Sequence, residues 1–170
     1  MRASPLLLVL AVAGCVAPPV QRAPAPAAPV ALPPPPKPVA LSGDWQDWPV
    51  TPGTWSYRRD ARGSLALFGQ TGSDAGLTLR CDTTARQIYL SRSGAATAAL
   101  TIRTSSATRA IAVQPTGGTP PYVAAAFAAT DPLLDAMAFS RGRVVVEQPG
   151  APTLVIPPYA EVGRVVQDCR

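Results

Sequence analysis

From residue 54 onward, apolar and polar residues alternate in short segments that have the length of β-strands. In segment 77–82, for example, Leu77, Leu79 and Cys81 fall on one face of an extended chain and polar residues fall on the other. The segments with this pattern are 54–59, 64–68, 77–82, 87–91, 98–103, 109–113, 144–147 and 153–156. One-sided alternation predicts an antiparallel sheet, because parallel strands buried on both faces would be continuously apolar. Segment 122–127 fits either a strand or a helix, and we assign it to a strand.

Two segments have the period of a helix instead. Asp131 followed by Pro132 is a typical helix start, because aspartate accepts hydrogen bonds from the first turn and proline fits the first helical position. This helix is expected to end at Gly142. In segment 159–169, apolar residues recur at i, i+3, i+4 and i+7, which predicts a second helix. The fold class is therefore mainly β, an antiparallel β-sandwich or small barrel with two short helices.

Two further segments precede this domain, which occupies residues 44–170. Residues 1–14 have the positive start, the apolar stretch and the small-residue end of a signal peptide. Residues 15–43 are rich in proline and alanine, and proline removes the backbone donors that helices and sheets require. We predict a disordered, extended tether with polyproline II character that holds the domain away from its point of attachment. Docking of the tether to a proline-reading partner is the alternative.

The apolar run near the start of the chain ends in the sequence VAGC, residues 12–15. A hydrophobic residue, two small residues and a cysteine in this order resemble the lipobox of bacterial lipoproteins. The resemblance implies cleavage before Cys15, a lipid on its sulfur, and attachment of the mature protein to a membrane through that lipid. An ordinary secretory signal is the alternative. Val16 stands where an aspartate commonly retains such proteins in the inner membrane, so the resemblance favours the outer membrane, facing the periplasm.

The chain has three cysteines, Cys15, Cys81 and Cys169. If Cys15 carries a lipid, the other two form an even pair in an exported protein, where disulfides persist. Cys81 lies on the inward face of its predicted strand, and Cys169 lies on the apolar stripe of the last predicted helix. We therefore predict a disulfide between Cys81 and Cys169 that links the last helix to the sheet. Two buried free thiols are the alternative.

The formal net charge of +5 suggests an anionic partner, but the positions of the charges weaken that interpretation. Arg2, Arg22 and Lys37 lie outside the domain, which contains 12 arginines scattered among 10 acidic residues. A nucleic-acid surface needs a basic stripe with aromatic stacking partners. No nucleic-acid partner is therefore expected.

The sequence contains no histidine, which excludes the Ser–His and Cys–His mechanisms and removes the commonest metal ligand. No catalytic residue, cofactor or metal site is assigned, and the protein is not expected to be an enzyme. A pair of carboxylates drawn from Asp131, Asp135, Glu147 and Glu161 is the alternative, because two facing carboxyl groups suit glycoside hydrolysis.

Three other features of the sequence each allow two interpretations. Trp45, Trp48 and Trp55 either cover one end of the core, which we expect, or form a ligand platform on which sugar rings stack. Segment 103–109 is interpreted as a hairpin loop; the alternative, a serine nucleophile, has no evident base in a domain without histidine or lysine. Segment 140–143 is interpreted as a helix end whose arginines complement the helix dipole, with anion binding as the alternative.

The sequence DPLLDAMAFSRGR and the final acidic residue, cysteine and arginine are similar to a pattern in uncharacterised bacterial envelope lipoproteins. That resemblance covers the predicted domain and implies a β-rich fold without a known activity. A looser similarity to small lipid-anchored β-barrel inhibitors of lysozyme or proteases rests on size, anchor, strand content and one disulfide. We therefore expect a lipid-anchored envelope protein with a binding or structural role, whose partner is an envelope protein or glycan. Inhibition of a lytic envelope enzyme is the alternative.

Overall fold

The computed structural model of the protein describes residues 41–170. The predicted signal peptide 1–14, the lipidation site Cys15 and nearly all of the predicted tether 15–43 lie outside these residues. In chain order, the elements are η1 (Trp45–Asp47), β1 (Thr54–Asp60), β2 (Gly63–Gly69), β3 (Leu77–Asp82), β4 (Gln87–Ser93), β5 (Leu100–Arg103), β6 (Thr108–Ile111), β7 (Gln114–Pro115), β8 (Tyr122–Ala128), α1 (Pro132–Ala138), β9 (Val144–Gln148), β10 (Ala151–Ile156) and α2 (Ala160–Asp168).

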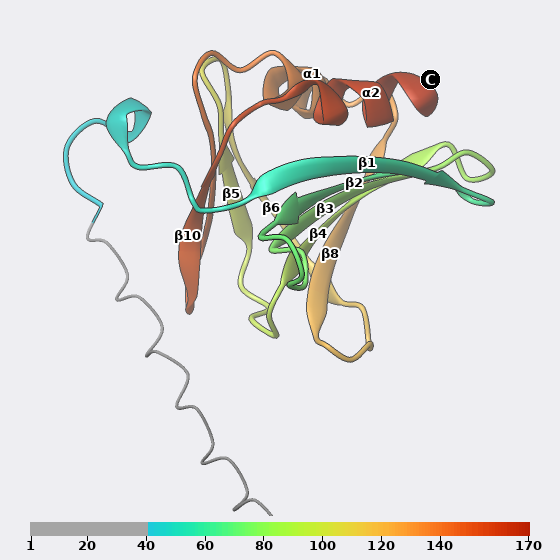
Figure 1. The fold of residues 1–170 in the computed structure, drawn as a ribbon, viewed down its shortest axis with the longest axis horizontal. Helices are drawn as coiled ribbons and strands as arrows, with labels where there is room; N and C mark the ends of the chain where they lie inside the picture. Colours follow the sequence, from blue (N-terminus) through green and yellow to red (C-terminus); the bar gives the residue numbers. More distant parts are fainter. Residues whose placement is uncertain (1–40) are drawn as a thin grey trace, which may run out of the picture. The chain divides into compact units, whose positions relative to one another are not determined.

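The strands form two antiparallel sheets. The first has six strands in the order β1-β2-β3-β4-β8-β7, and the second has four in the order β10-β9-β5-β6. Helices α1 and α2 lie together over one end of the sheets (Figure 1). The prediction of a mainly β, antiparallel domain with two short helices is confirmed.

The two sheets are connected at both borders. At one border, β6 of the four-stranded sheet is followed after only two residues by β7 of the six-stranded sheet. At the other border, the Thr51 N–H donates to the Val155 carbonyl of β10 at 2.8 Å, and the Val155 N–H donates to Thr51 Oγ1 at 2.9 Å. Three residues later the chain enters β1, the outer strand of the six-stranded sheet. The architecture is therefore a sandwich whose sheets are linked at both sides, close to a flattened barrel.

The core lies between the sheets and beneath the helices. Strand β3 alternates strictly between buried and half-buried residues, as the sequence pattern predicts. The largest fully buried apolar side chains are Phe68, Leu77, Leu79, Ile88, Leu90, Leu100, Ile102, Val123, Leu134, Met137 and Ile156. Helix α2 adds Val162, Val165 and Val166 to this core. None of the helices within residues 41–170 is long and apolar enough to span a membrane.

The predicted strands are all present, with ends shifted by a few residues, and 122–127 is part of a strand. The end of the first helix was predicted incorrectly: α1 ends at Ala138, not at Gly142. The Phe139 N–H donates to the Asp135 carbonyl at 2.9 Å, and Ser140 Oγ donates to the Arg143 carbonyl at 2.6 Å. The first bond is the last one of the helix, and the second closes the turn that leads into β9. The short elements η1 and β7 were not predicted.

The hairpin between β1 and β2 requires a glycine at position 63. Its φ is +142°, a value that side-chain-bearing residues rarely adopt. A Cβ atom there would lie 2.5 Å from the Cys81 carbonyl oxygen. Gly63 thus lets the β1–β2 turn approach the end of β3, where the disulfide lies.

Candidate functional site

The structure separates the three tryptophans. Trp55 on β1 is only 6% exposed, its Nε1 donates to the Pro157 carbonyl at 2.8 Å, and its ring centroid is 5.4 Å from that of Phe68. Trp55 therefore packs in the core, where it has no ring face available for a ligand. Trp45 on η1 and Trp48 just after it are half-buried. Only these two remain as candidates for a ligand platform.

Arg143 has a different role from the one predicted for segment 140–143. Its Nε donates to the Trp48 carbonyl at 2.6 Å, and its Nη1 donates to the Gln46 carbonyl. The last turn of α1 contains no basic residue. Arg143 thus fastens η1 to the start of β9 and does not complement a helix dipole, because α1 has already ended five residues earlier.

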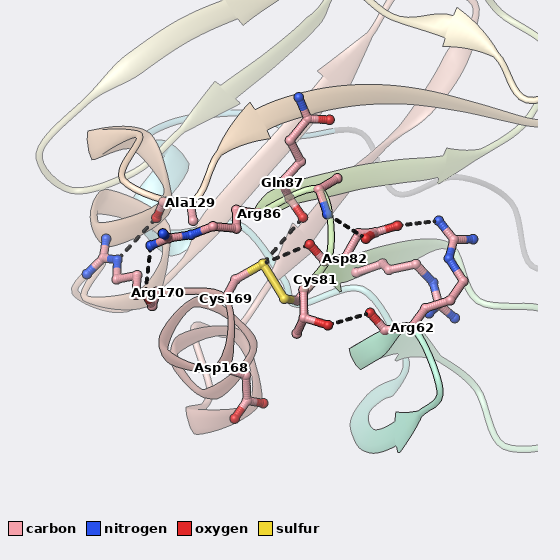
Figure 2. The surroundings of a disulfide bond; sticks show 12 residues. Arg62, Cys81, Asp82, Arg86, Gln87, Ala129, Asp168, Cys169 and Arg170 are labelled. Carbon is pink, nitrogen blue, oxygen red and sulfur yellow. Dashed lines mark hydrogen bonds and ion pairs between the residues drawn. A yellow bond between two sulfur atoms is a disulfide. The ribbon is translucent and has the colours of Figure 1, made fainter.

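The predicted disulfide between Cys81 and Cys169 is present, with 5.4 Å between the two Cα atoms. Figure 2 shows it between the end of β3 and the end of α2, with polar contacts on both sides. Arg86 Nη2 donates to the Arg170 carbonyl at 3.1 Å, and Arg170 pairs with Asp135 at 2.8 Å. The disulfide and these contacts together attach the last residues to the hairpin of β3 and β4 and to α1.

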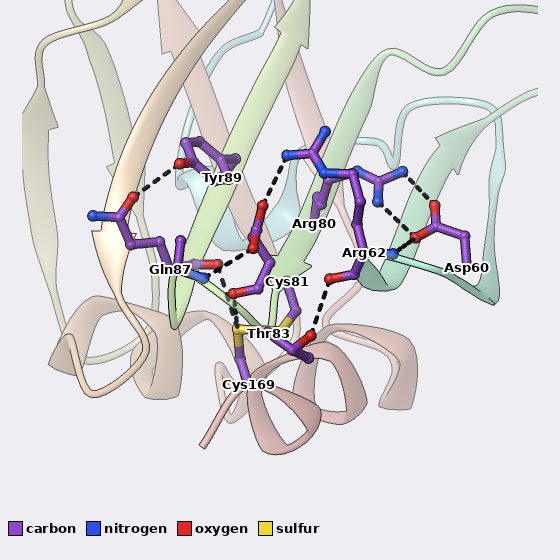
Figure 3. A network of polar contacts seen from close by, with 10 residues as sticks. Asp60, Arg62, Arg80, Cys81, Thr83, Gln87, Tyr89 and Cys169 are labelled. Carbon is purple, nitrogen blue, oxygen red and sulfur yellow. Dashed lines mark hydrogen bonds and ion pairs between the residues drawn. A yellow bond between two sulfur atoms is a disulfide. The ribbon is translucent and has the colours of Figure 1, made fainter.

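A network of charged residues lies across the two neighbouring hairpins (Figure 3). Arg80 pairs with Asp60 at 2.8 Å, and Arg62 pairs with Asp82 at 2.9 Å. Hydrogen bonds from the Arg80 guanidinium and the Arg62 backbone N–H lower the pKa of Asp60 to about 2. The Ala85 N–H and the Arg62 side chain lower the pKa of Asp82. The network joins the β1–β2 turn to the β3–β4 turn.

A second polar cluster connects β1 to α2. Tyr57 Oη donates to Asp168 Oδ2 at 2.5 Å, and Arg59 pairs with the other oxygen of the same carboxylate. The Arg164 guanidinium lies over the Tyr57 ring, 4.0 Å from its centroid. Burial alone would raise the pKa of Asp168, but the hydrogen bonds from Tyr57 and Arg59 outweigh burial and lower it.

Acidification is expected to destabilise the domain below about pH 4. Burial opposes the shift at Asp131, but hydrogen bonds from Arg109 and the Leu133 N–H lower its pKa, as partners do for Asp60, Asp82 and Asp168. Each of these carboxylates binds a proton more weakly in the folded than in the unfolded chain. Their contribution to stability is therefore complete above the ordinary aspartate pKa of about 3.9 and is lost as the pH falls through the folded values.

Melting temperatures measured from pH 7 to pH 2 test this expectation. The Asp168→Asn variant should melt at a lower temperature at pH 7 and should lose less on acidification, because one of the titrating groups is gone. A melting temperature that stays constant down to pH 2 would contradict the assignment of these contacts.

Three shallow hollows of about 290, 590 and 320 Å³ adjoin one another around the segment that leads into β1. Hydroxyl, amide and apolar side chains dominate their walls, which consist of Leu41, Pro49, Val50, Thr51, Pro52, Thr54, Ser56, Leu67, Phe68, Gly69, Gln70, Thr71, Gly72, Ser73, Asp74, Ala75, Gly76, Pro152, Thr153, Leu154 and Val155. The walls of these hollows contain a single carboxylate, that of Asp74.

The four carboxylates considered for hydrolysis do not meet in these hollows. Asp131 caps α1 and pairs with Arg109 at 2.9 Å, and the Asp135 carboxylate pairs with Arg170. Glu147 pairs with Arg103 at 3.4 Å on neighbouring strands, and Glu161 lies in the first turn of α2. In the part of the chain that the structure describes, no three His, Cys, Asp or Glu residues are grouped so that they could hold a metal ion.

Segment 103–109 forms the hairpin of β5 and β6, as predicted, with residues 104–107 as its loop and Arg103 paired with Thr108. The loop is held against the residues that follow α1. Thr104 Oγ1 accepts from the Ala107 N–H at 2.9 Å. The Ser105 N–H donates to Ser140 Oγ at 2.9 Å, and the Arg141 N–H donates to Ser105 Oγ at 2.8 Å. The loop therefore lies against the domain instead of protruding from it.

Arg92 is a buried residue that the sequence interpretation missed. Only 2% of its surface is exposed, and its guanidinium donates to the Val146 carbonyl at 3.2 Å and to the Pro152 carbonyl. Strand β10 has a register shift between Ala151 and Leu154, which takes Pro152 out of the sheet ladder. Arg92 therefore supplies the Pro152 carbonyl with a hydrogen-bond donor, which the neighbouring strand does not supply. The sequence did contain a signal, because extending the alternation of Ile88 and Leu90 by two residues puts Arg92 on the inward face.

These features define a two-sheet, antiparallel β-domain with one disulfide that ties its last helix to the six-stranded sheet. Comparison with family models, with curated proteins and with solved structures finds no match.

Proposed function

We propose that this protein is a lipid-anchored component of the bacterial cell envelope, held on the outer membrane through Cys15 and facing the periplasm. Its β-domain has a binding or structural role there. The observation that carries the proposal is the use of the cysteines: Cys81 and Cys169 are bonded to each other, and Cys15 is the third cysteine of the chain.

The disulfide supports export because disulfides persist in oxidising compartments and are rare in the reducing cytosol. Both sulfur atoms belong to buried residues, with Cys81 fully covered and Cys169 only 4% exposed. An even pair inside the domain leaves one cysteine, in the VAGC sequence, for acylation. Stable anchoring by lipid alone requires more than one acyl chain, which lipoprotein processing provides by resemblance.

Mass spectrometry of the protein purified from its native membrane tests this proposal. We expect a mature chain that begins at Cys15 and carries the mass of several acyl chains, and we expect it to fractionate with the outer membrane. Cys15→Ser should abolish both the added mass and the fractionation with the membrane. The control, Cys81→Ser, should keep both. An unmodified chain that begins at Met1 would overturn the proposal.

The inhibitor alternative depends on a loop that reaches out to a target enzyme. In this domain the hairpin loop between β5 and β6, residues 104–107, is instead bonded through Ser105 to Ser140 and Arg141, just after α1. We therefore propose the binding or structural role ahead of inhibition.

A further inference from the structure

Strand β1 is an outer strand whose far edge has no backbone partner among residues 41–170. The Gly76 N–H donates to the Phe68 carbonyl at 2.8 Å, so Phe68 and the alternate residues of β2 face β3. The other residues of β2 face β1, where Leu65 pairs with Arg58 and Leu67 pairs with Ser56. The N–H and C=O groups of Tyr57 and Arg59 must then point away from β2, because backbone direction alternates along a strand. No other backbone hydrogen bond to these groups is present among residues 41–170.

Positively charged side chains surround this edge. Arg58 and Arg164 have no carboxylate partner in the described part of the chain, and both residues are exposed. Arg59 is 67% exposed at its side chain even though it pairs with Asp168. Arg62 follows at the turn. The edge of β1 therefore combines unpaired backbone groups with two guanidinium groups, those of Arg58 and Arg164, that no carboxylate pairs with among residues 41–170. Asp60, at the end of the strand, is paired with Arg80.

The charges lie on both faces of the sheet beside this edge. Arg59 and Tyr57 point toward α2, because both contact Asp168. Arg58 lies between these two residues in the strand, so its side chain points to the opposite face. A strand added beside β1 also alternates its side chains between the two faces. Two adjacent acidic residues on that strand would thus meet Arg58 on one face and Arg59 with Arg164 on the other.

We propose that the edge of β1 binds an extended, acidic segment of a partner protein, which adds to the six-stranded sheet as a further strand. This inference rests on the binding role proposed above and names the chemistry of the partner. Main-chain hydrogen bonds provide affinity in this mode of recognition, and side chains provide specificity. An acidic segment places carboxylates beside these arginines, whereas a second copy of β1 carries the same two arginines, Arg58 and Arg59.

The test uses the intact chain in mild detergent and a short synthetic peptide, rich in valine and threonine, with two adjacent glutamates at its centre. We expect saturable binding by fluorescence anisotropy that weakens as salt is raised. Binding should slow hydrogen exchange at the amides of Tyr57 and Arg59. The amides of Ser56 and Arg58 already face β2 and should change little. The same peptide with glutamines in place of glutamates should bind at least about tenfold more weakly.

The double variant Arg58→Glu with Arg164→Glu should weaken binding of the glutamate peptide about tenfold or more. The matched control is Arg141→Glu, which reverses an exposed arginine outside this edge and should leave affinity unchanged. Circular dichroism establishes that each variant is folded, and the salt dependence of the unaltered chain gives a second measurement.

Three outcomes would overturn the proposal. The first is no binding of the glutamate peptide. The second is equal binding of both peptides, or binding without protection at the amides of Tyr57 and Arg59. The third is binding to vesicles containing an anionic phospholipid in preference to the peptide. Each is distinguishable from failure of the anchoring proposal, which the mass at Cys15 decides independently.

Discussion

Replacing both Cys81 and Cys169 by serine is expected to lower the free energy of unfolding by about 2–5 kcal/mol. The bond closes a loop with a sequence separation of 88 residues. Chain entropy alone assigns a loop of that length about 4–5 kcal/mol, and measured cases are usually lower. Because small domains are stable by only about 5–15 kcal/mol in total, this loss is a large fraction. Urea unfolding of the oxidised protein and of the double variant measures it.

Amide hydrogen exchange of the same two proteins should show where the bond acts. Helix α2 contacts β2 and β3, and its buried residues are Val162, Val165 and Val166. The disulfide fixes the end of that helix. Amide exchange in α2 should therefore accelerate more than exchange in β9 when the bond is removed. Cys15→Ser is the matched control and should leave the unfolding free energy of the domain unchanged. Equal stability of the oxidised protein and the double variant would contradict this prediction.

Replacing Arg92 by alanine is expected to cost about 3–5 kcal/mol of stability. The guanidinium is buried between the sheets and donates to the carbonyls of Val146 on β9 and Pro152 on β10. Burial lowers the pKa of Arg92, and no carboxylate pairs with it within residues 41–170. Removing the side chain leaves two carbonyls without this donor and creates a cavity. Urea unfolding measures the loss.

Two variants separate the causes of that loss. Arg92→Met fills most of the volume but donates nothing, so it should still cost about 1–3 kcal/mol. Arg141→Ala, at an exposed position, should change stability by no more than about 0.5 kcal/mol. If Arg92→Met is as stable as the unaltered protein, the two hydrogen bonds to β9 and β10 contribute nothing.

Local patterns predicted most of the fold because each depends on neighbouring residues only. The alternation of segment 77–82 corresponds to a strand with alternating burial, and Asp131 caps α1 through the Leu133 N–H at 2.8 Å. The inward positions of Cys81 and Cys169 predicted the disulfide. The end of α1 was missed because it depends on Ser140 and its partner across a turn, not on the glycine signal.

The candidate site was less accessible from the sequence. Trp45, Trp48 and Trp55 are close in the chain, yet Trp55 enters the core beside Phe68 while the other two lie on or next to η1. The positive charge near β1 could not be predicted from the sequence either. Arg58 and Arg164 are 106 positions apart in the printed sequence, and only the packing of α2 beside β1 brings Arg164 over Tyr57.

The sequence alone determined which segments become strands and helices, which faces turn inward, and which two cysteines can meet. Those properties follow from the spacing of apolar side chains along the chain, which matches the repeat of either a strand or a helix. Only the tertiary structure decided the order of the strands, the links between the sheets at both borders, the burial of Arg92, and the exposure of the β1 edge. These depend on contacts between residues far apart in the chain, so they are set when the sheets pair and not by any local period.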